Sequence, residues 1–98
     1  MQMSDLAGLP LEATQLHEVA EMLRDIRKVR VKSLGEEHVS VAEAACVLCL
    51  LYICLHDALQ AGQSLQEAQH VSQKAVSNKL DAMLSTAREG LQFVTSGL

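Results

Sequence analysis

The cysteines are the side chains whose spacing most resembles a chemical site. Cys46 and Cys49 form a CxxC pair, and Cys54 follows five residues later. Paired cysteines bind zinc when they lie on a tight turn and a second pair follows at a set distance. Here they lie among Val and Leu residues with no second pair, so we interpret them as small buried hydrophobic residues. We expect no metal site and no cofactor.

The histidines form no recognisable catalytic arrangement. His56 and Asp57 are adjacent, and adjacent residues on a helix point in different directions and do not pair. His17, His38 and His70 lack the HxxxH or HExxH spacing that is typical of metal ligands. Since no serine, second carboxylate or glycine-rich loop accompanies them, we predict neither an enzyme activity nor a small-molecule substrate.

Basic residues gather in one segment, and two interpretations of it remain open. Five of the eight Lys and Arg residues lie between positions 24 and 32: Arg24, Arg27, Lys28, Arg30 and Lys32. In the functional interpretation, Arg24, Arg27 and Lys28 contact an acidic protein partner. In the structural one, the segment is a solvated helix end that complements the negative pole of the helix dipole.

Length and composition exclude several classes of protein. The chain has 98 residues, which allows one domain, and 49% of them are hydrophobic, which is enough for a folded core. A formal charge of −4 and only two aromatic residues disfavour nucleic-acid binding. The longest uncharged apolar stretch, residues 44–55, has 12 residues, whereas a membrane span needs about 20. Unpaired cysteines and the lack of a secretion signal in residues 1–7 predict a cytoplasmic protein without a membrane span.

Apolar spacing predicts three long helices, over about residues 11–34, 40–61 and 64–94, after a flexible segment 1–9. The first carries one apolar stripe and ends at Gly35, because glycine adopts the left-handed conformation at low cost. The stripe consists of Leu16, Val19, Leu23 and Ile26.

Two capping boxes, Ser-x-x-Glu, predict where the second and third helices begin. They start at Ser40 and at Ser64, and Gly62 is the expected end of the second helix. Ser77 and Asn78 form a weak point at which the third helix bends or restarts. Short loops make neighbouring helices antiparallel. We therefore predict a single all-α domain, a bundle of three or four helices arranged as antiparallel hairpins.

The middle helix is apolar on nearly all faces, and two neighbours would cover only part of it. We therefore expect an exposed apolar surface that either self-associates or binds a helix of a partner protein. The candidate contacts are Leu48, Leu51, Tyr52, Leu55 and Leu59.

One block of the chain resembles tetratricopeptide repeats of the kinesin-light-chain type. Residues 34–42 read LGEEHVSVA, and they are followed by Leu48 and by Leu50-Leu51-Tyr52. In that family the corresponding block runs leucine-glycine-glutamate-glutamate-histidine-proline-x-valine-alanine, then leucine-x-leucine-leucine-tyrosine. Residues 17–23 resemble the second helix of a preceding repeat, and residues 65–76 resemble the second helix of the repeat that this block begins.

The chain also departs from the repeat pattern. Val39 stands where the repeat has proline, residues 53–63 are longer than the usual turn, and one residue is missing between Leu23 and Arg30. The resemblance covers about residues 17–76. It implies a scaffold of antiparallel helix pairs whose concave face binds a peptide or helix without catalysis.

These features favour a non-catalytic adaptor or chaperone that binds an amphipathic helix or an aggregation-prone segment of another protein. Small size, acidic charge and tetratricopeptide-like helices are also the general look of bacterial type III secretion chaperones. The alternative is a dimeric all-α nucleic-acid-binding regulator that uses the basic stretch 24–32.

Overall fold

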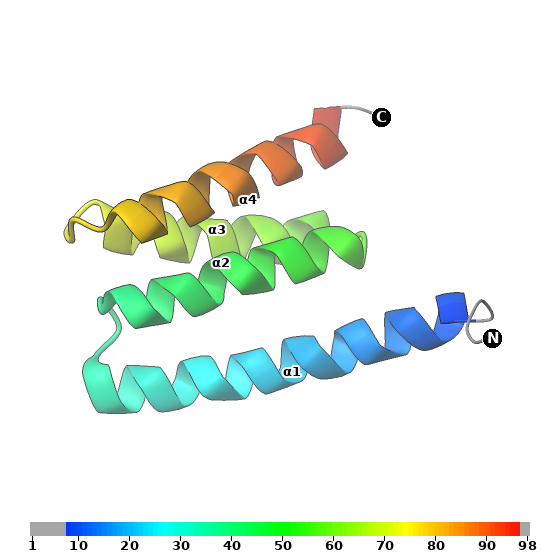
Figure 1. The fold of residues 1–98 in the computed structure, drawn as a ribbon, viewed down its shortest axis with the longest axis horizontal. Coiled ribbons are helices and arrows are strands. Elements are labelled where there is room, and N and C mark those ends of the chain that lie inside the picture. Colours follow the sequence, from blue (N-terminus) through cyan, green and yellow to red (C-terminus); the bar gives the residue numbers. More distant parts are fainter. Residues whose placement is uncertain (1–7, 97–98) are drawn as a thin grey trace.

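The computed structural model describes residues 8–96, with side chains from residue 14, and this part of the chain folds into four α-helices (Figure 1). They are α1 (Gly8–Leu34), α2 (Val39–Cys54), α3 (Ala58–Ser72) and α4 (Asn78–Ser96). Consecutive helices run antiparallel, and α1 and α4 lie on opposite sides of α2 (Figure 1). The predicted all-α class is therefore confirmed. Of the segment expected to be flexible, residues 1–7 lie outside the described range and residues 8 and 9 belong to α1.

The first helix ends where its sequence predicts. Gly35 follows Leu34 with φ of +95°, and its N–H donates to the Val31 carbonyl at 2.9 Å. A left-handed residue at this position is the usual end of an α-helix.

The second helix is shorter than predicted. It ends at Cys54, and the next three residues form a tight turn in which His56 has φ of +60°. The Asp57 carboxylate accepts a hydrogen bond from the Gln60 N–H at 3.1 Å, so Asp57 caps the N-terminus of α3. The predicted boundary at Gly62 is wrong, because Gly62 lies inside α3.

Neither predicted capping box forms. The N-cap of α2 is His38, whose Nδ1 accepts a hydrogen bond from the Ser40 N–H at 3.0 Å. The helix therefore begins before Ser40. Ser64 is buried within α3, six residues after Ala58, at which the helix begins. In both places a residue further upstream satisfies the free N–H groups first, which leaves the serine inside the helix.

The predicted third helix is in fact two helices, and the break at Ser77-Asn78 is confirmed. The helix α3 ends at Ser72 and α4 begins at Asn78, where the Ser77 hydroxyl accepts from the Leu80 N–H at 3.2 Å. The break therefore supplies a fourth helix, and Ser77, just ahead of it, is its capping residue.

Three helices surround α2, which contacts α1, α3 and α4. Eight of its residues are buried: Val41, Ala42, Ala44, Ala45, Cys46, Leu48, Cys49 and Tyr52. The expectation that α2 keeps a bare apolar face is therefore wrong, because α4 covers the side that two neighbours would have left open. By contrast, α1 packs against no described helix except α2.

None of the described helices has the length and apolar character needed to cross a membrane.

Candidate protein-binding groove

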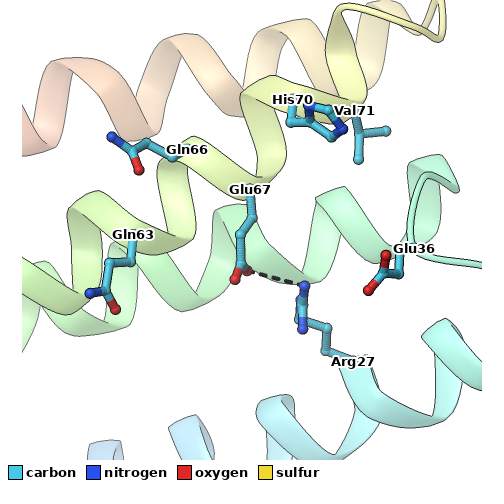
Figure 2. Close-up of a pocket in the computed structure, with 7 residues that line it drawn as sticks. All are labelled: Arg27, Glu36, Gln63, Gln66, Glu67, His70 and Val71. Atoms are coloured by element: carbon cyan, nitrogen blue, oxygen red, sulfur yellow. Dashed lines mark ion pairs between the residues drawn. The ribbon is translucent and has the colours of Figure 1, made fainter.

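A groove runs between α1 and α3, with α2 behind it (Figure 2). Its wide part has a volume of about 520 Å³ and is lined by Arg27, Glu36, Gln63, Gln66, Glu67, His70 and Val71. A narrower part of about 110 Å³ is lined by Arg24, Arg27, Leu48, Tyr52, Gln60, Gln63, Ser64 and Glu67. Since Arg27, Gln63 and Glu67 line both parts, the two parts adjoin each other.

Two arginines form the α1 wall, and each reaches another helix. Arg24 Nη1 donates to the Tyr52 hydroxyl at 2.9 Å, which ties α1 to the groove floor. Arg27 Nη2 forms an ion pair with Glu67 Oε1 at 3.3 Å, and this pair bridges the groove from α1 to α3 (Figure 2). Arg27 Nε is buried and has no hydrogen-bond partner among the described residues. The α1 wall is therefore held to α2 by Arg24 and to α3 by Arg27.

The α3 wall carries three glutamines spaced three residues apart, Gln60, Gln63 and Gln66. This spacing keeps their side chains on neighbouring positions of one side of the helix. Within residues 14–96, their side-chain amides take part in no hydrogen bond. A side-chain amide both donates and accepts, so this wall can pair with N–H and C=O groups alike.

An ion cluster holds one end of the groove in place. The Glu37 carboxylate, in the turn between α1 and α2, accepts from Lys74 Nζ and lies 3.2 Å from His70 Nε2. The hydrogen bond from Lys74, followed by that from His70, holds the pKa of Glu37 below its ordinary value of 4.5. The cluster thereby links the α1–α2 turn to the C-terminal end of α3.

The structure brings together members of both predicted residue sets. Leu48 and Tyr52, predicted to contact a partner, form the floor of the narrow part, and Arg24 and Arg27, predicted for an acidic partner, form its wall. Leu48 and Tyr52 are buried, so they shape the groove from below and do not offer an open apolar surface.

The other predicted residues lie elsewhere. Leu51 and Leu55 are half-buried against the core, Leu59 is exposed on α3, and Lys28 is exposed on α1. None of these four lines the groove.

Sequence reasoning missed the glutamine row. The predicted helices cover residues 40–61 and 64–94, so Gln60 falls at the end of one helix and Gln63 in the loop after it. That prediction places the two side chains on no common helix face. The pattern Asp57-x-x-Gln60 is itself a capping signature. It would have started a helix at residue 58 and placed both glutamines on it.

The surroundings of Cys46 and Cys49 disfavour the thiolate form of both side chains. Cys46 and Cys49 are completely buried, and burial raises the pKa of Cys46 to about 11 and raises that of Cys49 as well. Thiolates, not thiols, bind metals and act as nucleophiles. Among the described residues, no group of three His, Cys, Asp or Glu side chains is arranged to hold a metal ion. Cys54, in contrast, is exposed.

Several side chains of the basic segment, residues 24–32, form hydrogen bonds or ion pairs within the molecule. Besides the contacts of Arg24 and Arg27, Arg30 Nη1 donates to the Ser40 carbonyl at 2.9 Å. Three of the five basic side chains between residues 24 and 32 therefore bond within the molecule. Of these three, only Arg27 pairs with an acidic side chain.

Comparison of the chain with family models, curated proteins and solved structures found no match.

Proposed function

We propose that this protein is a non-catalytic interaction module that holds an extended segment of a partner protein in the groove between α1 and α3. The observation that carries the proposal is the groove itself, with hydrogen-bonding walls on either side of a floor that includes Leu48 and Tyr52. An extended peptide presents N–H and C=O groups along both edges. The unpaired amides of Gln60, Gln63 and Gln66 can bond to either kind of group.

The arginine wall supports a partner segment that carries a carboxylate. The Arg27–Glu67 pair is partly exposed, with 27% and 50% of the two side chains accessible, and such pairs contribute only about 0–1 kcal/mol. A carboxylate of the partner can therefore replace Glu67 at small cost. Arg24 and Arg27 remain the proposed contacts for an acidic group, whereas Lys28 lies outside the groove.

The order of helix packing agrees with a tetratricopeptide-like scaffold. The helix α2 packs against α3, its hairpin partner, and also against α4, which begins the next hairpin, while α4 contacts α3 as well. We assign the protein on this basis to the adaptors or chaperones, acting in the cytoplasm in the manner of small type III secretion chaperones. The alternative, a nucleic-acid-binding regulator, is less favoured because the chain has a formal charge of −4 and only two aromatic residues.

Peptide selection on the purified protein tests this function. A random-peptide phage library is selected against the full chain, and the enriched peptides are titrated into isotope-labelled protein and followed by ¹H–¹⁵N NMR. We expect extended peptides containing Asp or Glu, with chemical-shift changes at Arg27, Gln63 and Glu67. Peptides whose shifts map to α4, or a selection that enriches nothing, would contradict the proposal.

Matched variants separate the groove from the general surface. Arg27→Met keeps the aliphatic stem but removes the charge, and Gln63→Ala removes one amide of the row. Their controls are Arg88→Met and Gln92→Ala, which alter exposed residues of the same types on α4. We expect each groove variant to weaken peptide binding by about tenfold, equivalent to roughly 1.4 kcal/mol, and the controls to bind as the parent does. Equal affinities for the groove and control variants would place binding elsewhere. Titration of the protein with a double-stranded DNA oligonucleotide tests the alternative function, that of a nucleic-acid-binding regulator.

A further inference from the structure

One side of α1 carries apolar residues that no part of the described structure covers. Val19, Met22, Ile26 and Val29 are between 40% and 62% exposed, and their spacing of three, four and three residues places them along one line of the helix. We call these four residues the α1 stripe. Asp25, Ile26, Val29 and Arg30 enclose a shallow hollow of about 330 Å³ along it.

The α1 stripe is separate from both the core contact and the groove. The helix α1 packs on the core through the buried Ala20 and the half-buried Leu23. At 100° per residue, Arg24 points roughly 150° away from the stripe residues. Because Arg24 faces the groove, the stripe and the groove lie on opposite sides of α1.

The spacing of the stripe reads the same in both directions along the helix. Val19 and Val29 lie five residues on either side of position 24, and Met22 and Ile26 lie two residues on either side. Two copies of α1 placed antiparallel about this position would therefore match Val19 with Val29 and Met22 with Ile26. A two-fold interface requires a surface that is complementary to itself in this way, and the three-four spacing is that of helices that pack side by side.

The charges on α1 favour the antiparallel direction. Glu18 and Lys32 flank the stripe on one side. With the pair centred on position 24, Glu18 of one copy lies two residues, about 3 Å along the helix axis, from the position opposite Lys32 of the other copy, and these long side chains can span that offset. A parallel arrangement would instead place the two copies of Glu18 on opposite sides of the interface and leave Glu18 about 21 Å along the helix axis from Lys32 of the other copy. Neither side chain takes part in a hydrogen bond or ion pair in the described part of the chain. Both are therefore available for contacts between two copies.

From this symmetry and charge pattern we infer that the α1 stripe binds a second copy of the same chain, giving an antiparallel α1–α1 dimer. The dimer has two grooves, which face away from the shared interface. Since the contact involves one face of one helix, it lies at the small end of protein interfaces, and we expect a dissociation constant on the order of 10 μM. This inference is independent of what the groove binds.

Analytical ultracentrifugation of the full chain over a range of concentrations tests the dimer. Val29→Glu places a charge within the stripe, and we expect it to weaken self-association by about tenfold or more. The matched control is Val76→Glu, the same change at a fully exposed position between α3 and α4, which leaves the dimer intact. The inference is overturned if the parent protein is a monomer at about 100 μM, or if the two variants self-associate equally.

Two further experiments test whether the two α1 helices run antiparallel. They also test the dimer independently of Val29→Glu, so that a failure of that variant to fold does not decide the outcome. We expect E18K and K32E to weaken the dimer individually and to restore it when combined, whereas a parallel or unrelated interface gives no restoration. In a Cys54→Ser background, Asp25→Cys lies near the two-fold axis, and we expect a short bismaleimide reagent to cross-link it. Two copies of Val29→Cys would lie about 15 Å apart along the helix axis and remain uncross-linked. Equal cross-linking at both positions would indicate a parallel pair and overturn the antiparallel assignment.

Discussion

The N-cap of α3 provides the sharpest test of this fold, because structure and sequence place it at different residues. Asp57 Oδ1 accepts from the Gln60 N–H at 3.1 Å, whereas the Ser-x-x-Glu pattern points to Ser64. The difference affects the groove directly. A helix that begins at residue 58 includes Gln60 and Gln63 in its wall, and a helix that begins after Ser64 includes neither.

We expect Asp57→Ala to destabilise the protein by about 1–2 kcal/mol. Removing an N-cap side chain costs about 1 kcal/mol, and loss of a negative charge at the positive pole of the helix adds about 0.3–1 kcal/mol. In a domain of this size each kcal/mol lowers the melting temperature by roughly 4–8 °C. Ser64→Ala is the matched variant. Because Ser64 lies inside α3 and Ala favours helix interiors over Ser by a few tenths of a kcal/mol, its effect should be close to zero.

Urea denaturation followed by far-ultraviolet circular dichroism measures both variants. Equal m-values would show that each variant changes the free energy of unfolding and leaves the compactness of the two states unaltered. If Ser64→Ala proves as destabilising as Asp57→Ala, then α3 begins at Ser64. The turn at residues 55–57 and the glutamine wall would both then be wrong.

Three further predictions concern the core, the ion cluster and the thiols. Leu84 is 2% exposed, so Leu84→Ala should lower the free energy of unfolding by about 2–5 kcal/mol in urea denaturation. Phe93 is 76% exposed, so Phe93→Ala should change it by less than about 0.5 kcal/mol. Similar losses in the two variants would contradict the assigned burial. The folded-state pKa of Glu37 is lowered, so its contribution is present above its ordinary pKa of 4.5 and is lost as the pH falls through the folded-state pKa. The stability difference between the parent and Glu37→Gln should therefore shrink on acidification from about pH 6 to about pH 3, and a constant difference would exclude the cluster. Of the three cysteines, only the exposed Cys54 should react rapidly with a thiol reagent in the folded protein. Cys54→Ser should abolish that fast reaction. Rapid modification of Cys46 or Cys49 would show that their helix is not buried.

Sequence patterns located helix boundaries well where one residue type decides them and poorly where several candidates compete. Gly35 ends α1 as expected, because glycine is the residue that adopts φ of +95° without strain. Asp57 and Ser64 both have capping signatures, and each cap contributes only about 1 kcal/mol. Burial of the apolar stripe that begins at Ala61 outweighs that difference. That burial carries α3 across Gly62 and makes Asp57 the cap.

The all-α class and the burial of the middle segment follow from the sequence alone. A run as apolar as residues 44–55 must lie inside the protein wherever its neighbours come from. Only the tertiary structure decides which residues of α1 are covered. Leu23 packs on the core, while Val19 and Ile26, from the same predicted stripe, remain exposed. Adjacent lines of apolar residues on one helix differ little in hydrophobicity, and the position of α2 determines which of them is removed from water.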